Sequence, residues 1–202
     1  MKTASSRLSR FAFTLIELLV VISIIAILAS LTFSGVQTAL LSAKKVQARN
    51  DMSQIAIGVT SYYTEYGRYP IDSATVTTDD KAVYGNGTDN SAIINVLRCV
   101  TSGTTLNPRQ IQFLQPKVLT TGSAVKGCVG STGNWYDPWG AQYIIFIDAD
   151  YAGDINATAV GSGTVQIGVG VASVGYYFVK NNLAPGGALP STYDKTYLLS
   201  WQ

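Results

Sequence analysis

The sequence predicts an α+β protein in which a long N-terminal helix packs on a C-terminal antiparallel β-sheet. A helical pattern runs without a break from about residue 14 to residue 66. After residue 137, segments rich in Val, Ile and Tyr alternate with Gly, Asn, Asp and Pro, which is typical of short strands joined by turns. A sheet of this kind is expected to cover one face of the helix.

The first half of the predicted helix, residues 13–35, is apolar on all sides. It is long enough to span a bilayer, which takes about 20 residues, and Glu17 is its only charged residue. An ionisable side chain in such a segment is costly and therefore marks a functional position. The basic residues before the segment, which have no acidic residue among them, predict a cytoplasmic N-terminus. They are Lys2, Arg7 and Arg10.

The second half of the helix, residues 36–66, is amphipathic. Its apolar side chains recur at steps of three and four residues, which places them on one face. They are Leu41, Ala48, Met52, Ile55, Val59, Tyr62 and Tyr66. Gly67 and Pro70 follow, and these residues predict that the helix ends at Tyr66. We expect the first half to lie in lipid and the second half to pack on a domain.

The composition argues against two classes of function. The chain of 202 residues contains no histidine, which is the commonest general base and the commonest zinc ligand. Its net charge of +2 comes from the first twelve residues, so the remainder has no basic field that could hold nucleic acid. We therefore expect neither an enzyme nor a nucleic-acid-binding protein.

The chain is expected to divide into five parts: 1–12, 13–35, 36–66, 67–136 and 137–202. Residues 67–136 are rich in Thr, Ser, Asn and Gly, with only short apolar stretches such as "AIINVL" and "IQFL". We expect a variable loop region with one or two short helices there. In residues 137–202, the predicted strands of an antiparallel meander are "QYIIFID", "TVQIGVGVASV", "GYYFVKN" and "TYLLSW".

The N-terminal segment resembles a known type of signal. A basic leader, the sequence "AFTLIE" from Ala12 to Glu17 and a long apolar helix are similar to the class III signal of type IV pilins and of type II secretion pseudopilins. The resemblance implies that residues 1–12 are a prepilin leader, cut by a prepilin peptidase between Ala12 and Phe13. It also implies N-methylation of the new Phe13 amine. Ala12 stands where the family usually has glycine.

Two further segments resemble the major pseudopilins of type II secretion. "YYTEYGRYP", residues 62–70, is similar to the segment at the end of their helix. "DPWGAQY", residues 137–143, is similar to the segment that opens their sheet, with Gln142 in place of the usual proline. The resemblance implies a pilin-like fold and a structural subunit of an envelope-spanning filament that drives protein export.

Two alternatives stay open at this point. One is a type IV pilus subunit for adhesion, motility or DNA uptake, and the other is a membrane-anchored extracytoplasmic binding module. For a filament subunit, the implied partners are further copies of the chain, the prepilin peptidase, an inner-membrane assembly platform and minor pseudopilins. The implied location is the bacterial inner membrane, with one span and the C-terminal part in the periplasm or outside.

Cleavage would give Glu17 a partner. The new α-amine of Phe13 is largely cationic at neutral pH, and N-methylation keeps that charge. A cation and a carboxylate each cost several kcal/mol when buried alone, and pairing recovers most of that cost. We therefore expect Glu17 of an incoming subunit to meet the Phe13 amine of its neighbour and to fix the register of the filament.

The two cysteines, Cys99 and Cys128, lie in the part predicted to face outward. They are too few and too far apart for a zinc motif. An oxidising compartment favours a disulfide between them. The alternative is two reduced thiols that act as small buried apolar side chains.

The sequence "DADYAGDI" contains a candidate metal site, with Asp148, Asp150 and Asp154 as ligands. It resembles the first part of an EF-hand-like calcium loop, with Gly153 at the sixth position. Ala159 stands at the twelfth position, where a bidentate Glu is usual. The alternative is an Asp-rich turn after a strand, in which the carboxylates bond to nearby backbone. We expect no required cofactor, with calcium as the one candidate.

Overall fold

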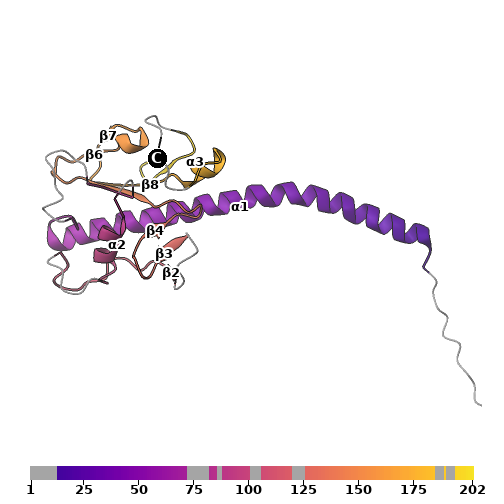
Figure 1. The fold of residues 1–202 in the computed structure, drawn as a ribbon, viewed down its shortest axis with the longest axis horizontal. Coiled ribbons are helices and arrows are strands. Elements are labelled where there is room, and N and C mark those ends of the chain that lie inside the picture. Colours follow the sequence, from indigo (N-terminus) through magenta and orange to yellow (C-terminus); the bar gives the residue numbers. More distant parts are fainter. Residues whose placement is uncertain are drawn as a thin grey trace, which may run out of the picture. The chain divides into compact units, whose positions relative to one another are not determined.

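The computed structural model describes residues 13–71, 82–85, 88–100, 106–119, 126–184, 189 and 194–202. The chain divides into two compact units, Met1–Ala43 and Lys44–Gln202. The leader of residues 1–12, with the predicted cleavage residue Ala12, lies outside the described residues. Helix α1 (Leu15–Tyr66) contributes residues to both units (Figure 1).

Helix α1 ends where the sequence predicts. Gly67 follows it with a φ of +66°, in the left-handed region that favours glycine, and its N–H donates to the carbonyl of Tyr63 at 2.8 Å. The amphipathic pattern is also confirmed, because one face of α1 is buried in the second unit. The residues on this face that are at most 1% exposed are Ala48, Met52, Ile55, Val59 and Tyr62.

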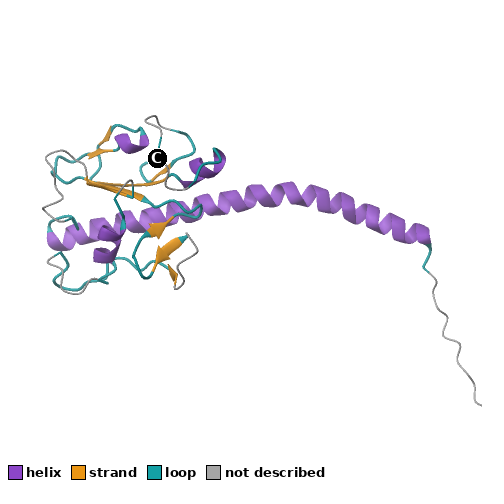
Figure 2. Ribbon diagram, in the orientation of Figure 1, coloured by secondary structure: helices purple, strands orange, loops and turns teal. Residues whose placement is uncertain are grey.

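The main sheet of the second unit has four strands, with each neighbouring pair antiparallel (Figure 2). Their order across the sheet is β1 (Ala82–Tyr84), β5 (Ile144–Ile147), β8 (Val169–Ser173) and β9 (Leu198–Leu199). Every residue of β5 is buried. The α+β class predicted from the sequence, a long N-terminal helix followed by antiparallel sheet, is confirmed.

Smaller elements complete the unit. The second sheet contains β2 (Val118–Leu119), β3 (Gly127–Val129) and β4 (Trp135–Tyr136), with β2 parallel to β3, and the third pairs β6 (Ile155–Asn156) with β7 (Thr164–Val165). The short helices are α2 (Ser91–Leu97), the 3₁₀ helix η1 (Thr158–Val160) and α3 (Gly175–Lys180). Helix α2 lies within residues 67–136, for which the sequence predicts one or two short helices without placing them, whereas the strands β1 to β4 lie in the same region and were predicted as loop.

The two faces of β5 have different environments. Ile144 and Phe146 belong to a buried cluster that also contains Ala172, Phe178 and Leu199. Side chains alternate along a strand, so the odd-numbered residues point the other way. Tyr143, just before β5, reaches Asp51 of α1 with its hydroxyl. The face of the sheet that carries Tyr143 is therefore the face directed toward α1.

One predicted strand is a helix. The segment "GYYFVKN" has the composition of a strand, yet residues 175–180 form α3. The Oδ2 atom of Asp137 accepts hydrogen bonds from the Ser173 hydroxyl at 2.7 Å and from the Gly175 N–H at 2.9 Å. These contacts hold the chain where β8 ends, and a Cβ at position 175 would collide with the same carboxylate. Tertiary contacts override the local β propensity here.

Candidate functional site

The N-terminal end of α1 is closed by a pair of residues. Thr14 precedes the helix, and both its N–H and its hydroxyl donate to Oε2 of Glu17, at 2.8 and 2.7 Å. In return, the N–H of Glu17 donates to the Thr14 hydroxyl at 3.3 Å. This reciprocal arrangement is a capping box, which satisfies backbone donors that have no partner inside the helix.

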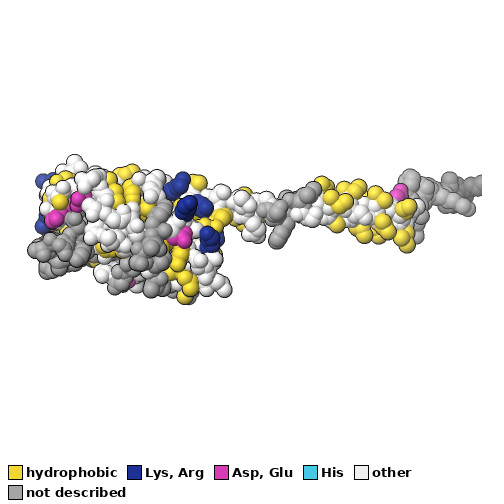
Figure 3. Space-filling view, turned by 90° about the horizontal axis from the view of Figure 1, so that it is seen from above, with side chains coloured by type: hydrophobic (Ala, Val, Ile, Leu, Met, Phe, Trp, Pro, Cys, Tyr) yellow, Lys and Arg dark blue, Asp and Glu magenta, His cyan; other side chains and the backbone are white. Residues whose placement is uncertain are grey.

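The surface around Glu17 is apolar and exposed. Hydrophobic side chains cover this segment of the helix in the described chain (Figure 3). A shallow groove of about 410 Å³ is lined by Phe13, Ile16, Glu17, Val20 and Val21. By its length and composition, α1 is the one helix among the described residues that could cross a membrane. A carboxylate therefore opens onto a surface that needs lipid or other helices to cover it.

The cap leaves Glu17 able to bind a second group. Both hydrogen bonds from Thr14 go to Oε2. A carboxylate has about four acceptor positions on its two oxygens, so Oε1 keeps its capacity for a further donor. Phe13, whose amine becomes the N-terminus in the predicted mature chain, is 71% exposed and lies next to the cap. This geometry suits contact between a cation and Glu17, although the expected pairing with a neighbouring subunit stays a prediction.

Asp137 is the polar centre of the second unit. Its carboxylate is fully buried and accepts four hydrogen bonds. Oδ1 accepts the N–H groups of Trp139 and Ala141, both at 3.0 Å, and Oδ2 accepts from Ser173 and Gly175. Burial raises the pKa of Asp137, and the four donors act in the opposite direction. The carboxylate joins the "DPWGA" turn to the junction of β8 and α3.

A second carboxylate lies between α1 and the sheet. The Tyr143 hydroxyl donates to Oδ2 of Asp51 at 2.9 Å. Burial raises the pKa of Asp51, and the charge of Asp137 raises it further. Asp51 belongs to the part of α1 that follows the apolar segment, so its bond with Tyr143 connects the helix to the rest of the second unit.

The predicted disulfide is not formed in the structure. Cys99 and Cys128 are both free thiols, as in the alternative reading of the sequence. Cys128 is buried in β3, with its Sγ 3.9 Å from the carbonyl oxygen of Gly133. Burial raises the pKa of this thiol, which keeps it protonated and unreactive.

The structure also does not gather the three aspartates of the predicted calcium loop. Within the described part of the chain, no group of three metal-ligating side chains is close enough to hold an ion. Asp148 instead accepts the N–H groups of Ala152 and Gly153, at 3.0 and 2.9 Å. Asp154 accepts from the side chain of Gln166. In this structure Asp148 thus organises a turn through local backbone donors, whereas the bond of Asp154 reaches a residue 12 positions later, and calcium binding stays a prediction.

Comparison with known proteins bears on the N-terminal segment. Residues 7–33 match the family described as "Prokaryotic N-terminal methylation motif". The chain thus carries a type IV pilin-like signal. The match includes Thr14 and Glu17, the residues of the cap, and Phe13 next to them. Neither the comparison with curated proteins nor the one with solved structures found a match.

Some residues of these sites were not singled out from the sequence. Thr14 was missed, although Thr followed three residues later by Glu is the known signature of a capping box. Asp137 and Tyr143 were noted only as parts of a motif. Buried Asn90 had no sequence signal at all, yet its side chain bonds the backbone of Trp135 and Tyr143 and so fixes the start of α2 against β4.

Proposed function

We propose that this chain is a membrane-anchored structural subunit of a type IV pilin-like filament. The observation that carries the proposal is Glu17, a carboxylate in an exposed apolar helix within the methylation motif. An ordinary membrane anchor has no use for a charge at this position. A helix that must align with identical neighbours has such a use, because a buried ion pair specifies register.

In this proposal, α1 performs two tasks. Its apolar N-terminal part holds the subunit in the inner membrane and later packs against the same part of other copies. Packing among such helices supplies the cohesion, since small and aliphatic side chains gain van der Waals contacts. Glu17, held in a defined rotamer by Thr14, presents Oε1 to the methylated Phe13 amine of a neighbour.

Within this class we favour a pseudopilin of type II secretion over a subunit of an adhesive or motile pilus. The support is the resemblance of two segments, 62–70 and 137–143, to the major pseudopilins. The prepilin peptidase, an inner-membrane assembly platform and minor pseudopilins are the partners that this assignment implies. The second unit then lies in the periplasm.

The experiment compares Glu17→Ala and Glu17→Gln with wild type in cells that carry the assembly machinery. Mass analysis of the N-terminal peptide first tests whether the mature chain begins at N-methylated Phe13. Sheared-filament yield then tests assembly. We expect both variants to insert in the membrane and both to lose most of the filament yield, because the amine of the neighbour has lost its charged partner.

The matched control is Ser23→Ala, in the same exposed helix, where the hydroxyl bonds only its own backbone, to Leu19. It should assemble as wild type does. A mature chain that begins near Ser30, or that keeps Met1, contradicts the filament assignment. Wild-type filament yield from Glu17→Ala contradicts the explanation of Glu17.

A further inference from the structure

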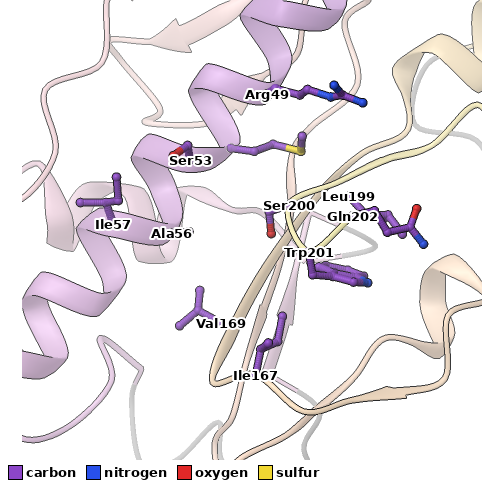
Figure 4. Close-up of a pocket in the computed structure, with 11 residues that line it drawn as sticks. Arg49, Ser53, Ala56, Ile57, Ile167, Val169, Leu199, Ser200, Trp201 and Gln202 are labelled. Atoms are coloured by element: carbon purple, nitrogen blue, oxygen red, sulfur yellow. The ribbon is translucent and has the colours of Figure 1, made fainter.

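A groove in the second unit lies between α1 and the end of the main sheet. Its volume is about 370 Å³. Figure 4 shows Arg49, Ser53 and Ile57 of α1 on one side and residues of the last segment, among them Ser200 and Trp201, on the other. The remaining lining residues are Met52, Ala56, Ile167, Val169, Leu199 and Gln202. The walls are thus mainly apolar with a few polar groups at the rim.

One basic group lies at the groove. Arg49 has the only charged side chain among the lining residues, and it is exposed. Ile57, also a lining residue, is 62% exposed. An arginine beside apolar side chains suits an occupant that combines an aromatic ring with a carboxylate, because guanidinium groups stack on aromatic faces and pair with carboxylates.

The second unit also exposes an aromatic ring beside a carboxylate, those of Tyr151 and Asp150. Tyr151, in the turn between β5 and β6, is 52% exposed and has a φ of +63°. This left-handed conformation is uncommon for a bulky residue and marks a position that the surrounding structure imposes. Asp150 precedes it and is exposed, and its Oδ1 accepts the N–H of Ala152 at 3.0 Å.

Tyr151 is ordered before any partner arrives. Its ring stacks on Tyr69 with centroids 5.5 Å apart, and Tyr69 stacks on Tyr63 of α1 at 4.7 Å. The hydrogen bond of Asp150 holds the turn that carries the ring. Docking a side chain that is already ordered costs little conformational entropy, which is typical of interface anchors.

We propose that Tyr151 and Asp150 of one subunit dock into the groove around Arg49 of a second copy of this chain. The tyrosine ring covers Ile57 and Trp201, and the Asp150 carboxylate approaches the Arg49 guanidinium. The two surfaces are different parts of the same molecule. Such a heterologous contact joins copies head to tail and, unless it closes a ring, continues without limit. The inference rests on the proposed filament and names a contact between its second units.

The first test fills the groove. Ser53 is exposed and lines it, so Ser53→Trp places a large side chain where the tyrosine would lie. We expect sheared-filament yield to fall about tenfold, as for the loss of one interface anchor. Ser131→Trp, at an exposed turn after β3 that does not line the groove, is the matched control and should assemble normally.

The second test exchanges the charges. Arg49→Glu and Asp150→Arg should each reduce filament yield, and the combined variant should restore most of it, because the pair is re-formed with reversed sign. Lys117→Glu controls for a change of net charge at an exposed site outside the groove. Tyr151→Ala should reduce the yield without affecting membrane insertion. This variant tests the contact even if Asp150→Arg disturbs the turn.

The outcomes separate the two proposals. If Glu17→Ala abolishes filaments while Ser53→Trp, Arg49→Glu and Tyr151→Ala assemble as wild type does, the docking is wrong and the filament assignment stands. If the charge exchange fails to restore filaments although Tyr151→Ala reduces them, the pairing of Arg49 with Asp150 is wrong. If wild type forms no filament with its assembly machinery, the proposed function itself fails.

Discussion

The hydroxyl of Tyr143 donates a hydrogen bond to Asp51 at 2.9 Å and so joins the sheet to a helix residue 92 positions earlier in the chain. Burial raises the pKa of Asp51 and also that of Asp137. A carboxyl group with a raised pKa in the folded state binds its proton more tightly than in the unfolded chain. Its contribution therefore favours folding at low pH and is lost as the pH rises above the ordinary value of 3.8.

The first prediction is that Asp51→Asn stabilises the second unit at pH 7. The amide can still accept the hydrogen bond of Tyr143, and no charge has to be buried. We expect the melting temperature of the full chain in detergent to rise by about 2 °C at pH 7 and hardly to change at pH 4. Tyr143→Phe should act in the opposite sense at pH 7. Equal effects of Asp51→Asn at both pH values would contradict this account.

The second prediction concerns Asp137. Asp137→Ala removes the acceptor of four buried donors, three of them backbone N–H groups, and should cost about 3 kcal/mol or more. The melting temperature should fall by more than about 6 °C. Asp89→Ala is the control, because Asp89 is exposed and accepts one bond from Gln142. A fall no larger than that of the control would show that the "DPWGA" turn is held by other contacts.

The third prediction separates the cap from the register function of Glu17. Thr14→Ala removes the hydroxyl that holds Glu17, at a cost of about 1 kcal/mol for the end of the helix. Thr14→Ser keeps it. In detergent, we expect faster amide hydrogen exchange over residues 15–18 in the alanine variant alone. Filament yield should fall less than in Glu17→Ala, because the carboxylate is still present. Loss of filaments in Thr14→Ser would point to a contact of the threonine methyl group instead.

The fourth prediction is that the two thiols differ in reactivity. Cys128 is buried with a raised pKa, and Cys99 is half-buried. In the folded protein, iodoacetamide should label Cys99 well before Cys128. Non-reducing peptide mapping of protein from the cell envelope provides the decisive control. A peptide that links Cys99 to Cys128 would restore the disulfide that the sequence predicts.

The helix could be predicted because its signals are local. The apolar run, the three- and four-residue steps and Gly67 all act within a few residues, and burial of Ala48, Met52 and Tyr62 follows the predicted face. The strand β5 was likewise marked by its own composition. Glu17 stood out because a single carboxylate in an apolar run is costly wherever it lies.

What could not be predicted depends on contacts between distant segments. Gly175 begins a helix and not a strand because Asp137, 38 residues earlier, accepts its N–H. The sequence of the aspartates near Tyr151 favours a turn over a metal site without excluding the metal, and the choice depends on where the backbone donors lie. Thr14 is the exception, since its capping signature, a Thr followed three residues later by Glu, is local.

The last prediction follows from the turn that Asp148 organises. Its two oxygens accept the N–H groups of Ala152 and Gly153, and neither Asp150 nor Asp154 completes a group that could hold a metal ion. We therefore expect the melting temperature to be the same in millimolar calcium and in chelator. Asp148→Ala should destabilise the unit by about 1–3 kcal/mol, because the Gly153 N–H loses its acceptor in a partly buried turn, whereas the Ala152 N–H keeps its second bond to Oδ1 of Asp150. Asp154→Ala, which removes one exposed bond to Gln166, should change stability by less than about 0.5 kcal/mol. A calcium-dependent rise in melting temperature that Asp150→Ala abolishes would mean that the loop rearranges to bind the ion, as in the calcium-loop interpretation of its sequence.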